Sequence, residues 1–258
     1  MKLYSYSKGR MNNFIRFISR IIFGRLLPRL AYPVIRGPLQ GARFILGAGA
    51  GEGGGASVYF AMVEPEQTSA FVNTLKNGMI FFDIGANVGY YTILGARLVG
   101  SQGKVFAFEP LIQNLYHLYR HTLLNKTNNV TIVSAACSDT LSLAIFSAGE
   151  NSATGHLGEE NDTDNKFPVL TISIDEVVQR LHVFPSVIKI DVEGAELSVL
   201  KGAKGTLRKE KPKIFLSTHS DVLRKTCLEY LREYGYAYEV LSQDKLNPSE
   251  FLAVYAGE

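Results

Sequence analysis

Residues 81–91 read FFDIGANVGYY, and their types and spacing could hold a cofactor. Asp83 follows an apolar run, and Gly85, Asn87 and Gly89 come at alternate positions after it. A strand that turns through glycines into a helix is the context of a nucleotide-type cofactor site. The dinucleotide pattern G-x-G-x-x-G is absent, so a dinucleotide fits this turn poorly. A smaller cofactor with its own ammonium and carboxylate could use Asp83 as a counterion and the N–H groups of the turn.

Two further acids follow predicted strands, at positions where they could bind a nucleoside. Glu109 ends the strand-like string KVFAFEP, 24 residues after Gly85, where it could accept both ribose hydroxyls of an adenosine. Asp139, in AACSDT, follows the next strand and could accept a hydrogen bond from an adenine amino group, or else close an Asx-type turn. Gly85 would let the backbone approach the ligand, and Gly89 would let the helix approach the strand.

Candidate catalytic residues lie in VIKIDVEGAELSVLKGA, residues 187–203. This buried strand carries Lys189 and is followed by Asp191 and Glu193. Such charged residues are explained if the carboxyl end of the strand opens into a ligand crevice, as in doubly wound sheets. Burying two carboxylates at such a position costs free energy unless they are solvated or interact with a ligand. We therefore expect Asp191 and Glu193 to be functional, and Glu196 to stabilise the start of the next helix through its dipole.

A histidine follows the fifth strand, in FLSTHS, residues 215–220. His219 should lie on the same sheet edge as Asp191, and a histidine of near-neutral pKa can take a proton from a hydroxyl. The alternative interpretation of this stretch is polar capping of the next helix by Ser220 or Asp221.

The other histidines and the cysteines do not predict a metal site. His117 and His121 are spaced i, i+4 on a helix, but no neighbouring acid supports ligation, so we expect them on a solvated face. Cys137 and Cys227 belong to no CxxC or Cys/His cluster, and we expect two half-buried thiols in a reducing compartment.

Alternating strands and helices must position these residues. The order predicts a parallel sheet with helices on both faces. The strand-like runs are 79–84, 104–109, 129–135, 186–192 and 213–219, and the helical segments lie near 88–98, 111–124, 195–203 and 221–234. Residues 141–149 and 168–174 are predicted strands that flank an exposed polar loop, and 237–242 and 250–257 are predicted to pair antiparallel.

Charge separates the N-terminal region from the rest. Residues 1–40 carry eight cations and no acid, which leaves 19 bases against 24 acids, a net charge of −5, for the remainder. Nucleic-acid binding is not expected, because it would need positive charge over the folded body. An amphipathic helix over 14–22 could contact an anionic membrane surface or a lipid-linked substrate, or pack on the protein's own core.

The N-terminal region shows no pattern for secretion or for spanning a membrane. No apolar run approaches the roughly 20 residues of a spanning helix, and arginines interrupt what would be a signal peptide. We expect a cytoplasmic protein, with peripheral contact at the inner membrane surface left open. Residues 47–55, GAGAGEGGG, predict a flexible surface loop, and 58–60 a strand. Residues 1–60 and 61–258 are therefore taken as two regions, the second being the enzyme domain.

The chain resembles the FkbM family of S-adenosylmethionine-dependent methyltransferases from about residue 60 to 255. The resemblance is carried by FFDIGANVGYYTILGARLVG, KVFAFEP and, most specifically, IKIDVEGAELSVLKGA. It implies an α/β fold with a Rossmann-like seven-stranded sheet, helices on both faces and an antiparallel last strand. It also implies that Asp83, Gly85, Asn87 and Gly89 surround the methionine part of the cofactor, with Glu109 on the ribose. Family members are associated with O-methylation of sugars and polyketide-type hydroxyls.

One departure from the family pattern concerns metals. The family often has an acid before the histidine, but Ser217 and Thr218 precede His219 here. Metal-dependent catechol-type methyltransferases need acids after both the fourth and fifth strands, so no obligatory metal is expected. We expect O-methylation of a sugar, glycan or polyketide-like small molecule, with Asp191, Glu193 or His219 as the base. The alternatives are an NAD-dependent oxidoreductase and a non-catalytic protein with a methyltransferase fold.

Overall fold

The computed structural model describes residues 28–48, 56–147, 156–157, 166–242, 244 and 246–257. The chain divides into two compact units, with the boundary between Val63 and Glu64. The amphipathic helix over 14–22, residues 49–55 of the glycine-rich loop and the polar loop over 161–166 except its last residue lie outside the described residues, so these features stay predictions. No helix in the described ranges is both long and apolar enough to cross a membrane.

The described part of the first unit, residues 28–48 and 56–63, contains two short strands and one helical turn. Strands β1 (Ala31–Pro33) and β2 (Arg43–Ile45) pair antiparallel, and helix α2 spans Ala56–Tyr59. The strand expected over residues 58–60 is therefore wrong. A helical turn satisfies this backbone internally, since the amide of Met62 donates to the carbonyl of Ser57, and it buries Tyr59, whose hydroxyl donates to the Phe44 carbonyl at 2.7 Å.

The second unit is built on a seven-stranded sheet in the order β12-β13-β11-β10-β3-β4-β5. All neighbours are parallel except that β13 runs antiparallel to both β11 and β12. This confirms the expected Rossmann-like sheet with its antiparallel last strand. The strands are β3 (Ile80–Ile84), β4 (Lys104–Phe108), β5 (Val130–Val133), β10 (Val187–Ile190), β11 (Lys213–Ser217), β12 (Tyr236–Val240) and β13 (Glu250–Tyr255).

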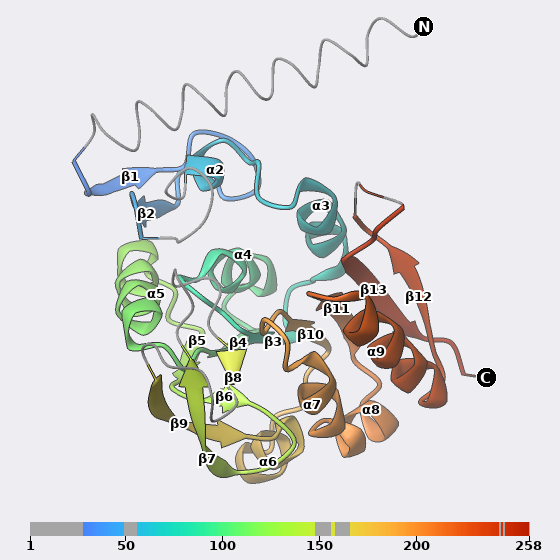
Figure 1. Ribbon diagram of the computed structural model, residues 1–258. Helices are drawn as coiled ribbons and strands as arrows, with labels where there is room; N and C mark the ends of the chain where they lie inside the picture. Colours follow the sequence, from blue (N-terminus) through green and yellow to red (C-terminus); the bar gives the residue numbers. More distant parts are fainter. Residues whose placement is uncertain are drawn as a thin grey trace, which may run out of the picture. The chain divides into compact units, whose positions relative to one another are not determined.

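Helices cover both faces of this sheet, α3, α4 and α5 on one and α6 to α9 on the other (Figure 1). The sequence did not predict α3, α6 or α8. The helices are α3 (Pro65–Thr74), α4 (Tyr90–Val99), α5 (Ile112–Asn125), α6 (Ile174–Leu181), α7 (Glu196–Lys201), α8 (Lys204–Lys209) and α9 (Asp221–Glu233).

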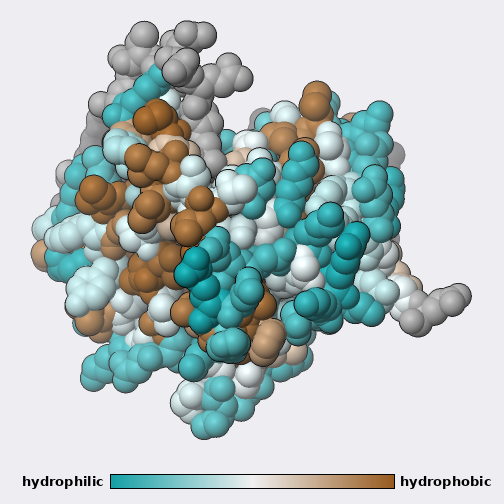
Figure 2. Space-filling view, turned by 90° about the horizontal axis from the view of Figure 1, so that it is seen from below, coloured by the Kyte–Doolittle hydropathy of each residue, from teal (hydrophilic) through white to brown (hydrophobic). Residues whose placement is uncertain are grey.

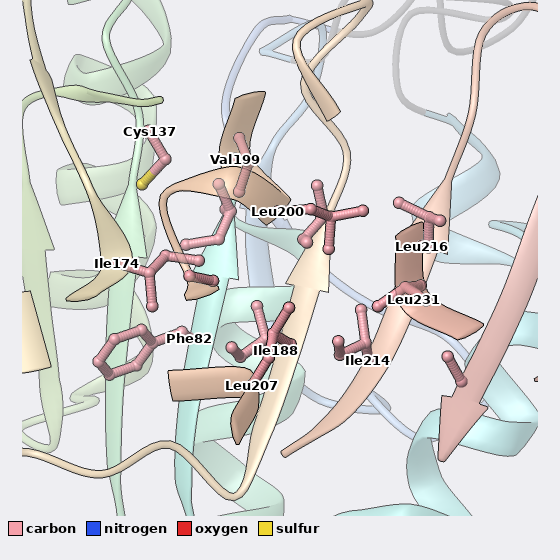
Figure 3. Packing of buried hydrophobic residues seen from close by; sticks show 14 of the residues in the cluster. Phe82, Cys137, Ile174, Ile188, Val199, Leu200, Leu207, Ile214, Leu216 and Leu231 are labelled. Carbon is pink, nitrogen blue, oxygen red and sulfur yellow. The ribbon is translucent and has the colours of Figure 1, made fainter. Parts of the chain in front are cut away.

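Successive side chains of a strand point to opposite faces of the sheet, so the apolar core has one part on each face. Phe82, Ile188 and Leu216 point towards α6 to α9 and pack with their apolar side chains (Figure 3). On the other face, Phe71 of α3 meets Phe81 and Phe215 edge to face, with ring centroids 5.0 and 5.3 Å apart. Burial of these large side chains fixes the strand ends relative to one another.

A second, four-stranded sheet stands beside the carboxyl end of the main one. It has the order β6-β9-β7-β8, with β6 (Ala136–Cys137), β7 (Ser142–Ser147), β8 (His156–Leu157) and β9 (Lys166–Ile172). The expected strands over 141–149 and 168–174 are thus present and pair antiparallel. One side buries Phe146 and Val169, whereas Leu143, Ile145 and Leu170 are exposed. Figure 2 shows apolar side chains gathered on this side of the molecule.

Two expectations about burial are wrong. Cys137 and Cys227 are free thiols that are fully rather than half buried. His121 is also fully buried, because α5 packs it against the start of α4, where its Nδ1 donates to the Val88 carbonyl at 2.6 Å. Burial lowers the pKa of His121 to about 4, so this imidazole is neutral at physiological pH.

Candidate active site

A cavity of about 350 Å³ opens where the parallel strands of the main sheet end. Its wall includes Gly85 after β3, Glu109 after β4, Asp191 and Glu193 after β10, and His219 after β11. Because the carboxyl ends of parallel strands share one edge, residues far apart in the sequence meet here. The structure thus brings together most of the residues that the sequence singled out.

The glycine turn after β3 is fixed by close backbone packing. Gly85 has a φ of +80°, and a Cβ atom at this position would lie 1.8 Å from the carbonyl oxygen of Asp191. Glycine is therefore required for β3 and β10 to end side by side, and the ligand is not the only reason for it. Asn87 also has a left-handed backbone, and its Oδ1 accepts from the Val88 amide at 2.8 Å.

Gly89 allows close packing, but against a different neighbour from the one expected. A Cβ atom here would lie 2.6 Å from Cδ1 of Leu118, so the glycine lets α5 pack against the start of α4. The close neighbour is a helix side chain and not the strand.

Glu109 connects two parts of the cavity wall. Its Oε2 accepts from the Asn87 amide at 2.8 Å, and its Oε1 accepts from the Leu111 amide at 2.9 Å and from Nδ2 of Asn114 at 3.2 Å. Burial raises the pKa of Glu109 to about 7, although these hydrogen bonds act in the opposite direction. A carboxylate has about four acceptor positions, so capacity remains for a ligand hydroxyl.

Asp83 and Asp139 are placed outside the cavity wall. Asp83 is buried, and its Oδ2 accepts from the Thr92 hydroxyl of α4 at 2.6 Å. Burial raises the pKa of Asp83 to about 6, even though nearby Lys189 and the Thr92 hydrogen bond lower it. Asp139 is exposed after β6, with the hydroxyls of Ser138 and Thr140 at 3.3 and 3.5 Å from its Oδ1.

His219 is surrounded by three carboxylates. Its Nδ1 lies 2.7 Å from Oε1 of Glu196, and its Nε2 lies 3.5 Å from Oδ1 of Asp191 and 3.4 Å from Oε1 of Glu193. Burial lowers the pKa of His219, but the Glu196 hydrogen bond and the three negative charges outweigh it and raise the pKa to about 8. The helix cap expected as the alternative for residues 215–220 is also present, since the Ser220 hydroxyl caps α9 by accepting from the Leu223 amide.

Glu196 is a functional candidate that the sequence reasoning missed. It begins α7 as expected, but its side chain is fully buried, accepts from the Gly194 amide at 3.0 Å and holds His219. An acid in the first turn of a helix is common, so its type and position alone did not reveal the contact with a residue 23 positions away.

Lys189 neutralises part of this negative charge. It is almost fully buried, and its Nζ lies 2.7 Å from Oδ2 of Asp191 and 4.7 Å from the centre of the Tyr91 ring. Burial raises the pKa of Asp191, but the ammonium of Lys189 outweighs it and the net shift is downward. Asp191 is therefore a stable carboxylate and a weak proton acceptor.

The same cluster could hold a metal ion. Asp191, Glu193 and His219 each offer a ligand atom, and these atoms lie within 4.8 Å of one another. Two carboxylates and an imidazole suit a divalent cation. Positive charge is also available without a metal ion, because Lys189 contacts Asp191 and His219 can carry a proton.

Three residues of the cavity wall have a strained backbone. Glu64, Asn87 and Glu193 line it, and all three are non-glycine residues with φ between +36° and +52°. A left-handed conformation costs about 1–2 kcal/mol for such a residue. Strain of this kind clusters at functional sites, where the surrounding structure maintains it.

Comparison with known proteins agrees with this geometry. The family model described as "Methyltransferase FkbM domain" matches residues 83–238. A curated relative, the hexuronic acid methyltransferase AglP of Haloferax volcanii, is 28% identical over 172 residues, which cover 66% of this chain and 67% of the relative.

Solved structures share the fold. A precorrin-6y C5,15-methyltransferase from Geobacter metallireducens superposes with a TM-score of 0.50 at 18% identity, covering 74% of this chain and 87% of that one. An FkbM methyltransferase from Methylobacillus flagellatus gives 0.51 at 18% identity, covering 78% of this chain but only 54% of that one. At this identity the likeness concerns the fold alone.

Proposed function

The chain belongs to the FkbM methyltransferase family and uses S-adenosylmethionine, and from this premise we propose that it methylates a hydroxyl of a sugar, a glycan or a polyketide-like small molecule. Methyl transfer itself follows from the family. A sugar-type acceptor is supported by the hexuronic acid methyltransferase among the relatives. The hydroxyl as the methylated group is supported by the side chains at the strand ends.

The cavity fits this cofactor. Its volume of about 350 Å³ lies in the range of small-molecule sites. Glu109 offers a carboxylate for ribose hydroxyls, and Phe108 and Phe146 offer apolar surface for a base. The hydroxyl of Ser217, also in the wall, is buried and has no hydrogen-bond partner in the part of the chain that the structure describes. A bound ligand can satisfy it.

The position of His219 carries the proposal. When bound, the cofactor would supply a methyl group on a positively charged sulfur, and the neutral thioether that leaves, S-adenosylhomocysteine, needs no activation. His219 donates its Nδ1 proton to Glu196, which leaves Nε2 free to accept a proton when the ring is neutral. An acceptor hydroxyl that attacks the methyl group loses its proton to Nε2, and Asp191 and Glu193 stabilise the resulting imidazolium.

The charge of the wall favours a neutral acceptor group. Asp191 and Glu193 line the cavity beside Nε2 of His219, and a carboxylate acceptor at this point would add a further negative charge to the cluster. We therefore favour a neutral hydroxyl over an acid group. The basic N-terminal residues leave a lipid-linked glycan open as the carrier of this hydroxyl.

The test uses S-adenosylmethionine with a ¹³C-labelled methyl group. The protein is incubated with neutral sugars, uronic acids, amino sugars and polyketide-like alcohols, and the products are identified by NMR. A methyl ether on a neutral hydroxyl supports the proposal, whereas a methyl ester or an N-methyl product overturns it. Cofactor binding without transfer to any acceptor of this panel would contradict the proposed acceptor class.

A further inference from the structure

Glu64 is an acid of the cavity wall that neither the sequence pattern nor the family match singles out. It directly precedes α3 and lies outside the matched residues 83–238. Its side chain lines the same cavity as Gly85 and Glu109. It is half-buried, so its carboxylate can meet a ligand.

The two oxygens of this carboxylate differ in their hydrogen bonds to the described residues. Oε2 accepts from the Tyr91 hydroxyl at 2.8 Å and from Nε2 of Gln67 at 2.5 Å. Oε1 has no hydrogen-bond partner among the described residues. Gln67 is fully buried and Tyr91 nearly so, which holds the carboxylate in one orientation. Such an arrangement is preorganised for a cation that binds at Oε1.

The methionine end of the cofactor presents such a cation. Its α-ammonium group needs an acidic partner, and the expected partner, Asp83, is turned towards Thr92 and does not line the cavity. Asp191 does line it but is already paired with Lys189. Glu64 is tied through Tyr91 to α4, the helix that begins directly after the glycine turn.

We propose that Glu64 binds the α-ammonium group of S-adenosylmethionine. Glu250 also lines the wall and lies near Glu64, but burial and the negative charge of Glu64 raise its pKa to about 7, which makes Glu250 the weaker partner for a cation at neutral pH. Glu64 thus holds the amino-acid end of the cofactor while Glu109 holds its sugar. This assignment concerns cofactor binding alone and does not depend on the identity of the methyl acceptor.

Calorimetric titration of the full chain with S-adenosylhomocysteine and with its deaminated analogue tests the assignment. Glu64→Gln should weaken binding of S-adenosylhomocysteine about 10- to 100-fold, the range for a hydrogen bond to a charged group. Binding of the deaminated analogue should stay within about twofold of wild type, because it lacks the group that Glu64 recognises. An equal loss for both ligands, or no loss for either, would overturn the proposal.

Two further variants control for folding and for charge. Tyr91→Phe keeps the carboxylate but removes one of its anchors, so it should weaken S-adenosylhomocysteine binding by a smaller factor. Glu66→Gln removes an exposed acid of the same helix and should leave both affinities unchanged. A loss in Glu66→Gln equal to that in Glu64→Gln would mean that general charge, and not a specific contact, explains the effect.

Discussion

His219 lies with Nδ1 2.7 Å from Oε1 of Glu196, a carboxylate that is fully buried. This contact orients the imidazole so that Nε2 faces Asp191 and Glu193 at the cavity wall. A base that is held by a second, buried group is the arrangement that activates proton acceptors in many enzymes. Glu196 acts through His219 and is a positioning residue.

Glu196→Gln should change the pH dependence of the reaction. In the wild type, kcat/KM should rise with pH through about 8, because His219 must lose its proton to act as a base. The amide can still accept from Nδ1 but carries no charge, so the pKa of His219 should fall and the rise should move to lower pH. The pH profile measures this shift, and a rise that stays at the wild-type pH would contradict the account. Glu233→Gln, which changes an exposed acid at the end of α9, should leave the profile unchanged.

Glu109 should make cofactor affinity depend on pH. Its pKa of about 7 means that the carboxylate ionises between about pH 6 and 8, and the ionised form accepts more strongly from ribose hydroxyls. The affinity for S-adenosylhomocysteine should therefore rise over this range. Glu109→Gln should weaken binding about tenfold at pH 8 and flatten the dependence. Titration calorimetry at several pH values measures both effects, and a variant with wild-type affinity throughout would rule out this role.

The raised pKa of Glu109 makes the folding stability fall with pH, whereas the cofactor affinity rises with pH. The folded protein holds the proton of Glu109 more tightly than the unfolded chain does, because the pKa is raised from about 4.5. The stabilisation is complete below the unfolded pKa and is lost as the pH rises through about 7. Cofactor binding should offset this loss, since it uses the ionised form.

Gly85→Ala should be strongly destabilising. The new Cβ would lie 1.8 Å from the Asp191 carbonyl oxygen, so β3 and β10 would have to separate. We expect the free energy of unfolding to fall by more than the roughly 1–2 kcal/mol that a left-handed backbone alone costs. Gly194→Ala is the matched control, because this glycine also has a positive φ but no atom lies within 4 Å of the added carbon. Denaturant unfolding of both variants compares the two costs, and equal losses would show that the contact with Asp191 is unimportant.

Removal of divalent metals should leave the activity unchanged. The ammonium of Lys189 already balances the charge of Asp191 at 2.7 Å, and a neutral thioether leaves the sulfonium without help from a Lewis acid. Methyl transfer measured after dialysis against EDTA should match the untreated rate within experimental error. Loss of activity that Mg²⁺ or Mn²⁺ restores would instead assign Asp191, Glu193 and His219 as metal ligands.

Much of the fold and part of the site follow from the sequence. The main strands have apolar residues on both faces, and the ends of parallel strands share one edge, so the meeting of Glu109, Asp191 and His219 could be predicted. The α6 helix was missed although Ser173 and Glu176 form a capping-box pattern, in which the Ser173 hydroxyl accepts from the Glu176 amide.

The remaining site residues depend on tertiary contacts that no local pattern records. Glu64 and Glu196 are both acids near helix starts, where acids are frequent, and only the fold brings one to Tyr91 and the other to His219. The orientation of Asp83 was open to prediction: Phe82 and Ile84 face α6 to α9, so the residue between them must face α4.

His219→Asn tests the central claim most directly. The methyl-transfer rate at saturating cofactor and acceptor and the affinity for S-adenosylhomocysteine are measured side by side. If His219 takes the proton of the acceptor, the rate should fall about 10²- to 10⁴-fold while the affinity stays within about twofold. An unchanged rate, or an affinity that falls in the same proportion as the rate, would contradict the account.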